Sequence, residues 1–301
     1  MDARPKAVGT FAGQIRQFEM VRNFMTSGTL FLLADAPFAL FFIWVIFLIG
    51  GPIALVPLAL LPLSLIAGLY ARWRVARLSE EQLKDAKKMV VLDMDDTILK
   101  GRFIDTFTKR FGLTDQLEEI RKRNTDSTLR TKAIAKMFKG KNIGELMETV
   151  DSIEIIQDAA KVIKELKARE YVVGIITDSY DFVANHIRHK IGADFSLANE
   201  LEFSNSIATG EVKIPSFFFH HENSSCLHTI CKSNALDHIL KKYEINAGNC
   251  IAMGDSENDI CMVKKAGFGI AFRSKNEYLK QTADLLIHEE KFEPLLEYAV
   301  H

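Results

Sequence analysis

Two acidic clusters far apart in the chain carry the residue types of a metal-assisted phosphoryl-transfer site. Residues 93–97, Asp-Met-Asp-Asp-Thr, directly follow the apolar run 89–92, and residues 254–259, Gly-Asp-Ser-Glu-Asn-Asp, lie much further downstream. The apolar run is typical of a buried strand, and residues two apart on an extended chain point the same way. Asp93 and Asp95 therefore project together, so that one carboxyl group can attack while the other moves a proton.

The elements that must position these clusters alternate between strand-like and helical patterns from residue 79 to residue 301. The strand-like segments are 90–93, 172–177, 250–253 and 269–271, and the helical ones are 159–167, 182–190, 234–242 and 259–265. This alternation predicts an α/β fold with a parallel sheet wrapped by helices. Residues 103–156 are mostly helical in pattern and too long for a simple crossover, so we expect a small helical cap inserted after the first strand.

Four polar segments follow one another in an order that is typical of a known family. They are residues 93–97, residues 177–179, Lys232 at the start of a helical pattern, and residues 254–259. In this order and spacing they resemble the haloacid dehalogenase superfamily, specifically its phosphoserine phosphatase-like branch, over residues 88–298. The resemblance implies a Rossmann-like fold and a phosphatase that acts on a small phosphorylated metabolite through an aspartyl phosphate.

The same resemblance implies a role for each polar residue. Asp93 is the expected nucleophile, and Asp95 is the expected general acid and base. Thr177 and Lys232 are expected to hold the transferring phosphoryl group. A carboxylate that attacks a phosphate dianion meets like-charge repulsion, so a divalent cation is required, and Mg²⁺ suits an all-oxygen site. The expected ligands are Asp93, Asp255 and the backbone carbonyl of Asp95, with Asp259 in support.

The expected substrate-binding residues depart from that branch. Its phosphoserine phosphatases carry a glutamate suited to an ammonium group where this chain has Arg102, which favours a carboxylate or a second phosphate. A solvated residue at the hinge of the cap is the alternative for Arg102. Lys132 stands where the phosphoserine phosphatases have a substrate-binding arginine in the cap. The loop with Asp178 and Ser179 is bulkier and more acidic than the corresponding loop of those enzymes. Asn258 is expected to contact the substrate or to order the metal loop. These departures argue against phosphoserine itself.

The first quarter of the chain has the composition of a membrane anchor. Between residues 28 and 71 the only charged side chain is Asp35. A helix over residues 28–49 would be about 33 Å long, enough to cross a hydrocarbon core of about 30 Å, and a second apolar segment follows at 53–70. Basic residues flank the pair, and its turn is uncharged, so the positive-inside rule places the downstream domain in the cytoplasm. We therefore expect a transmembrane hairpin in the lipid bilayer of the cytoplasmic membrane, with a hairpin buried in a soluble core as the alternative.

Residues 16–81 also resemble part of the membrane domain of type I secretion exporters of the ATP-binding cassette class. The matching stretches include residues 21–24, 34–39, 49–52 and 60–63. The sequence has no Gly-x-x-x-x-Gly-Lys-Ser/Thr phosphate loop, so the chain cannot be a complete pump. We expect two domains, 1–78 with the hairpin and 79–301 with the phosphatase-like fold. The alternatives are an exporter fragment fused to an incidental phosphatase domain, and a phosphotransferase of the same superfamily.

The charge and the cysteine content bear on the partners and the redox state of the chain. The net charge is -1, and the basic residues are scattered among acidic ones, so we expect no nucleic-acid partner. Four cysteines are too few for a disulfide scaffold, and we expect reduced thiols. One cluster resembles a zinc ligand set, although its spacing matches no common finger: His220, His221, Cys226, His228 and Cys231. Nothing in the sequence indicates an oligomeric state.

Overall fold

The computed structural model describes residues 41–55, 66, 68 and 70, and residues 87–299 except 125 and 223. The chain forms two compact units, Met1–Ala86 and Lys87–His301. In the first unit, residues 41–50 are helical, and the 3-10 helix η2 (Gly51–Ala54) follows them. None of the helices in these described segments combines the length and the hydrophobicity that a membrane crossing needs. Most of the hairpin expected at 28–71, and the boundary expected between residues 78 and 79, lie outside the described residues.

The second unit is built on a seven-stranded sheet with the order β4-β3-β2-β1-β5-β6-β7. Its strands are β1 (Lys88–Leu92), β2 (Tyr171–Tyr180), β3 (Phe195–Ser204), β4 (Ile207–Lys213), β5 (Cys250–Gly254), β6 (Phe268–Phe272) and β7 (Leu285–Ile287). All neighbours pair in parallel except β3 and β4, which form an antiparallel pair. The α/β fold with a mostly parallel sheet is therefore confirmed, and the hairpin β3–β4 and the edge strand β7 add to what the sequence pattern predicts.

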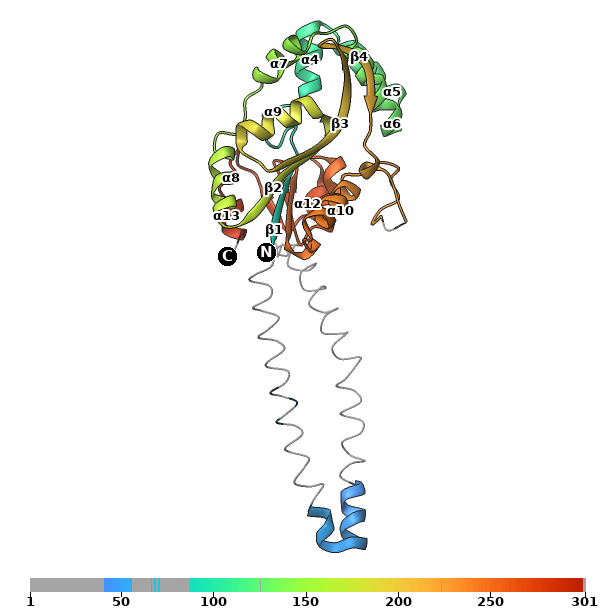
Figure 1. The fold of residues 1–301 in the computed structure, drawn as a ribbon, viewed down its shortest axis with the longest axis vertical. Coiled ribbons are helices and arrows are strands. Elements are labelled where there is room, and N and C mark those ends of the chain that lie inside the picture. Colours follow the sequence, from blue (N-terminus) through green and yellow to red (C-terminus); the bar gives the residue numbers. More distant parts are fainter. Residues whose placement is uncertain are drawn as a thin grey trace, which may run out of the picture. The chain divides into compact units, whose positions relative to one another are not determined.

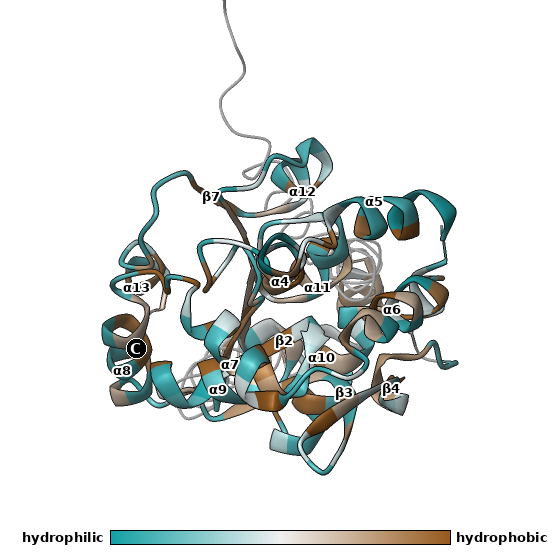
Figure 2. Ribbon diagram, turned by 90° about the horizontal axis from the view of Figure 1, so that it is seen from above, coloured by the Kyte–Doolittle hydropathy of each residue, from teal (hydrophilic) through white to brown (hydrophobic). Residues whose placement is uncertain are grey.

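Both faces of this sheet are buried, and β1 shows why. Val90 and Leu92 belong to one hydrophobic core, whereas Met89 and Val91 belong to the core on the opposite face. A continuous apolar run is what a strand covered on both faces requires. One face is covered by α8 (Ala159–Ala168), α9 (Asp181–Ile191) and α13 (Leu295–Tyr298), and the other by α10 (Lys232–Tyr243), α11 (Ile260–Lys265) and α12 (Glu277–Thr282) (Figure 2).

A helical cap fills the segment between β1 and α8. Its elements are α4 (Phe103–Phe111), α5 (Thr114–Arg123), α6 (Ser127–Ala135), η3 (Lys136–Phe138) and α7 (Ile143–Asp151). Figure 1 shows them beyond the carboxyl end of the sheet, together with the far ends of β3 and β4. Phe138 lies at the centre of this cap, with ring centroids 4.5 Å from Phe107, 5.8 Å from Phe103 and 5.0 Å from Tyr180. These helices lie within residues 103–156, where the sequence predicts a cap, and the bounds of that cap stay a prediction.

The direction of winding reverses beside β1. The chain moves outward from β1 through β2 to β3, and it returns to β5 on the other side of β1. In open parallel sheets, ligands bind outside the carboxyl ends of the strands at such a switch point. Asp93 directly follows β1 and Asp255 directly follows β5, and the backbone N–H of Asp93 donates to the carbonyl oxygen of Met253 at 2.9 Å. The fold therefore brings the two acidic clusters of the sequence side by side.

Candidate active site

A buried lysine joins two of the carboxylates at the end of the sheet. Lys232 is the first residue of α10, and its Nζ lies 2.6 Å from Oδ1 of Asp93 and 2.7 Å from Oδ1 of Asp259. The Lys232 side chain is only 4% exposed. Burial alone would lower the pKa of Lys232, but Asp259 and Asp93 raise it well above its usual value, so the lysine stays charged.

Gly254 allows Asp259 to fold back over the end of β5. The Oδ2 of Asp259 accepts hydrogen bonds from the backbone N–H groups of Asp255 at 3.1 Å and Ser256 at 3.0 Å, and from Oγ of Ser256 at 3.2 Å. A Cβ on residue 254 would lie 2.3 Å from Cγ of Asp259, so only glycine fits there. Because Oδ1 of Asp259 holds Lys232, both carboxylate oxygens already have partners, and this residue positions the loop and the lysine.

The carboxylates at this point fit a divalent cation. Oxygen atoms of Asp93, Asp255 and Asp259 all lie within 4.8 Å of one another, and Lys232 supplies a single compensating charge. Burial, and then the charge of Asp259, raise the pKa of Asp93 well above its usual value and that of Asp255 to about 6. Excess buried negative charge of this kind is costly without a cation, and carboxylate oxygens are the ligands that Mg²⁺ prefers.

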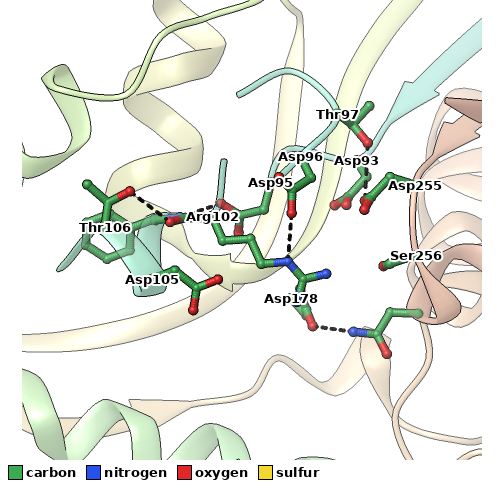
Figure 3. A network of polar contacts seen from close by, with 12 residues as sticks. Asp93, Asp95, Asp96, Thr97, Arg102, Asp105, Thr106, Asp178, Asp255 and Ser256 are labelled. Carbon is green, nitrogen blue, oxygen red and sulfur yellow. Dashed lines mark hydrogen bonds and ion pairs between the residues drawn. The ribbon is translucent and has the colours of Figure 1, made fainter. Parts of the chain in front are cut away.

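Asp95 is held by the first residue of the cap. Its Oδ1 accepts a hydrogen bond from the backbone N–H of Phe103 at 2.9 Å, where α4 begins. Burial raises the pKa of Asp95 to about 7, and the bond from Phe103 opposes that shift only in part. A carboxyl group with such a pKa can both donate and accept a proton near neutral pH. Figure 3 shows Asp95 beside Asp93 at the end of β1.

A cavity lies beside the acidic cluster, between the segment after β1 and the segments after β5 and β6. It has a volume of about 500 Å³, and its lining includes Asp255, Arg102, Arg273 and Lys275. Arg102 lines the cavity and donates from Nε to Oδ2 of Asp96 at 3.0 Å (Figure 3). Its lining thus includes three basic side chains and three acidic ones, Asp96, Asp255 and Glu257.

The carboxyl-terminal part of β2 meets the loop after β5. Nδ2 of Asn258 donates to Oδ2 of Asp178 at 2.7 Å, which ties that loop to the strand. Thr177 is wholly buried, and its Oγ1 accepts a hydrogen bond from the backbone N–H of Ser179 at 3.1 Å. Since that oxygen accepts from Ser179, its own hydrogen remains available for a ligand. The last paired residues of β1 and β2 are Leu92 and Ile175, so Thr177 lies near Asp93 at the same edge of the sheet.

Comparison with known proteins identifies the family to which this site belongs. Residues 90–264 match the model of the haloacid dehalogenase-like hydrolases. The chain belongs to this family. It is 30% identical over 222 residues to the phosphoserine phosphatase of Methanocaldococcus jannaschii, an alignment that covers 72% of this chain and 99% of the relative. It is 27% identical over 208 residues to the phosphoserine phosphatase of Archaeoglobus fulgidus, covering 68% of this chain and 57% of the relative.

A solved structure described as a phospho-aspartyl intermediate analogue of phosphoserine phosphatase is similar as well. The TM-score is 0.59 at 29% identity, with 71% of this chain and 99% of the other chain covered. These similarities make the chain a phosphatase of the haloacid dehalogenase superfamily. The family match begins at residue 90, so the exporter-like character of residues 16–81 stays a prediction.

Most of the site residues expected from the sequence converge in this haloacid dehalogenase-like hydrolase. The residues that line or adjoin the cluster are Asp93, Asp95, Arg102, Thr177, Asp178, Ser179, Lys232, Asp255, Asn258 and Asp259. Lys132 is different: it is exposed on α6 and is not among the residues that line the cavity.

The site also contains residues that the sequence pattern does not single out. Asp96 binds Arg102, and Oγ1 of Thr97 lies 3.5 Å from Oδ1 of Asp255. Both belong to the segment 93–97, so the position of that segment at a strand end could have indicated them. Arg273 and Lys275 follow β6 and line the cavity, and the same argument about strand ends applies to them.

Proposed function

We propose that this chain is a Mg²⁺-dependent phosphomonoesterase that forms an aspartyl phosphate at Asp93 and acts on a small phosphorylated metabolite. The observation that carries the proposal is the cluster of the buried Asp93, Lys232 and Asp259 with the half-buried Asp255 at the switch point of the sheet. The similarity to a phosphatase structure described as a phospho-aspartyl intermediate analogue supports the same chemistry.

In the first step, a carboxylate oxygen of Asp93 forms a bond to phosphorus while the bond from phosphorus to the leaving alcohol breaks. Asp95 gives its proton to the leaving alcohol oxygen, which its raised pKa of about 7 allows at neutral pH. The ammonium group of Lys232 holds Asp93 in place and offsets the negative charge of the phosphoryl oxygens. The hydroxyl hydrogen of Thr177 is free to donate to one of those oxygens.

In the second step, water attacks the phosphorus of the aspartyl phosphate and releases Asp93. Asp95, now a carboxylate, takes the proton from that water and is restored for the next cycle. Bound Mg²⁺ would neutralise charge between the phosphoryl group and the carboxylates. Asp93 and Asp255 are the side chains that would hold it, with the backbone carbonyl of Asp95 as a further ligand, because the oxygens of Asp259 already have partners.

The cavity supports a substrate that carries a second anionic group instead of an ammonium group. Arg102, Arg273 and Lys275 line it, and Arg102 lies close enough to Asp255 and Asp178 for their charges to raise its pKa despite partial burial. Asp96 now pairs with Arg102 and Glu290 with Arg273, and a carboxylate or second phosphate of the substrate would replace these partners. The proposed substrate class is therefore a phosphate monoester with a further acidic group.

The test uses the full chain in detergent and a panel of phosphate monoesters that differ only in their second group. Phosphate release should require Mg²⁺ and should be fastest for esters with a carboxylate or a second phosphate. The Asp93→Asn chain should keep its fold and lose phosphate release, and acid-quenched mass spectrometry should find phosphate on Asp93 only in the unsubstituted chain. Undiminished release by Asp93→Asn would exclude the mechanism. Transfer of phosphate to an added alcohol in preference to water would identify a phosphotransferase.

We further propose that residues 28–71 tether the enzyme to the cytoplasmic membrane, with the catalytic unit in the cytoplasm. The support comes from the sequence alone, namely the length of the apolar run 28–49 and the basic residues on both flanks. Extraction of membranes with alkaline carbonate tests this proposal, because an integral protein stays with the lipid. Recovery of the intact full chain in the aqueous fraction without detergent would refute it.

A further inference from the structure

Outside the acidic cluster, three cysteines and a histidine converge from two separate segments. The groups are Cys226, His228 and Cys231 in the loop before α10, and Cys261 in α11. One ligand atom from each lies within 4.8 Å of the other three, and Nδ1 of His228 is 3.5 Å from Sγ of Cys261. Ligands about 2.3 Å from a tetrahedral zinc ion are about 3.8 Å from one another, so the cluster is close to the required size.

The backbone of the loop places these side chains on one side. Cys226 and His228 are two residues apart in irregular chain, and both contribute to the cluster, whereas Leu227 between them is 96% exposed. A leucine left in solvent gains nothing from burial, so hydrophobic packing does not explain this conformation. The conformation is explained instead by Cys226 and His228, whose side chains converge on Cys231 and Cys261.

The environment of the thiols suits a metal ligand set. All four cysteines of the chain are free, and three of them lie in this cluster. Oγ of Ser233 donates to Sγ of Cys231 at 3.2 Å. Hydroxyl groups that donate to a sulfur stabilise its thiolate form, which is the form that binds metal. Cys250 is different: it is buried in β5, and burial raises its pKa to about 12.

The cluster is also open to ions from solution. A cleft of about 520 Å³ is lined by Cys226, His228 and Cys261, together with Glu257 and Tyr278. This cleft provides the entry path that a metal site needs. Cys231 is the buried member of the set, and His228 is the exposed one.

We propose that Cys226, His228, Cys231 and Cys261 form a tetrahedral Cys₃His zinc site that fixes the loop in front of α10. Three thiolates and one imidazole are a complete ligand set for structural zinc, with no position left open for catalysis. The spacing within the loop is Cys-x-His-x-x-Cys, and the fourth ligand comes from α11 instead of His220 or His221.

The proposed zinc site lies next to the acidic cluster in the sequence. Cys231 directly precedes Lys232, and Cys261 lies two residues beyond Asp259, so the proposed zinc site joins the two segments whose side chains form the Lys232–Asp259 ion pair. The metal would thus hold the lysine segment against the loop after β5. The zinc site does not depend on the proposed phosphatase mechanism, and its test needs no turnover.

The test begins with zinc content in the full chain, expressed without a histidine tag and purified in detergent with reductant. Unsubstituted protein should carry about one zinc per chain, and Cys261→Ser should lower this to below about one tenth. Cys250→Ala is the matched control, because it removes the fourth thiol of the chain but should leave the zinc content unchanged. Cobalt substitution should give thiolate charge-transfer bands and the intense visible bands of a four-coordinate ion, both altered in His228→Ala.

His228→Ala should stay folded, because this side chain is exposed and its removal does not disturb the core. A loss of metal binding in this variant is therefore not explained by unfolding. Removing zinc with a zinc-selective chelator, in the presence of Mg²⁺, should increase hydrogen exchange in residues 224–232 and leave β1 unchanged. The proposal is overturned by unsubstituted chain that takes up no zinc or cobalt, or by Cys261→Ser or His228→Ala with an unaltered cobalt spectrum. A disulfide between two of the three thiols in reductant-purified chain would overturn it too.

Discussion

Nζ of Lys232 lies 2.6 Å from Oδ1 of Asp93, and each of these side chains is only 4% exposed. The two residues are 139 positions apart in the chain. Nζ of Lys232 also lies 2.7 Å from Oδ1 of Asp259. Such a buried ion pair is weak evidence for stability in itself, but removing one partner leaves an uncompensated buried charge. The lysine therefore affects both the fold and the chemistry.

Lys232→Met should destabilise the protein and inactivate it. The free energy of unfolding should fall by about 3–5 kcal/mol, because two buried carboxylates lose their cation. Phosphate release should fall about 10²–10³-fold, which is the usual effect of removing one preorganised group that stabilises the transition state. Urea denaturation and steady-state kinetics measure the two effects. Lys132→Met is the matched control, and its unfolding free energy should change by less than about 0.5 kcal/mol because that lysine is exposed. An equal loss in both variants would contradict the assignment.

Asp95→Asn should slow the reaction according to the leaving group. With an alkyl phosphate, kcat/KM should fall about 10²–10⁴-fold, because the departing alcohol needs a proton. With an aryl phosphate, whose phenolate leaves without help, the loss should be much smaller. In the unsubstituted chain, kcat/KM for the alkyl ester should decrease above pH 7, since the pKa of Asp95 is about 7 and the first step uses its protonated form. Equal losses for both esters would show that Asp95 is not the general acid.

The effect of Mg²⁺ on stability should grow with pH. The folded-state pKa of Asp255 is raised from 3.8 to about 6, so without metal this group makes no unfavourable contribution below about pH 4 and its full contribution above pH 6. Stability in chelator should therefore decrease between pH 4 and pH 6. Mg²⁺ binds the carboxylate form, so at about 100 times its Kd it should add about 2.7 kcal/mol at pH 8 and far less at pH 5.

Melting temperatures at pH 5 and pH 8, with Mg²⁺ and with chelator, measure this difference. Asp255→Asn should remove most of the stabilisation by Mg²⁺ at pH 8. A Mg²⁺-induced shift that is larger at pH 5 than at pH 8 would contradict the acidic cluster as the binding site.

Arg102→Glu should reverse the preference for the second group of the substrate. The ratio of kcat/KM for an ester with a second acid to that for an ester with an amino group should fall by at least about tenfold, which corresponds to about 1.4 kcal/mol. Competition between the two esters measures the ratio directly. Arg110→Glu makes the same charge change in the cap, where Arg110 pairs with Glu148, and should leave the ratio unchanged. The substrate class would be wrong if Arg102→Glu lowered the rates of both esters equally.

The sequence predicts the parts of this site that follow buried parallel strands. The strands β1, β2 and β5 have apolar runs, so the polar residues at their carboxyl ends were expected to converge. The hairpin β3–β4 is harder to predict, because the buried positions of β4 are Ala208 and Gly210, which carry little hydrophobic signal. Cys261 joining the loop 226–231 depends on how α10 and α11 pack, and local spacing contains no information on that contact.

Gly254→Ala should disrupt the site without a change of charge. The new Cβ would lie 2.3 Å from Cγ of Asp259, so the aspartate must move away from the backbone N–H groups and from Lys232. Overpacking of this kind costs about 1–3 kcal/mol, and the affinity for Mg²⁺ and the rate of phosphate release should both decline. Gly248→Ala is the control at the other end of β5, where a Cβ meets only the side-chain oxygen of Asn246 at 3.3 Å, and it should keep full activity. If Gly254→Ala retained wild-type kinetics and Mg²⁺ affinity, the folded-back Asp259 would have no part in catalysis, and Lys232 would have to be held in place by Asp93 alone.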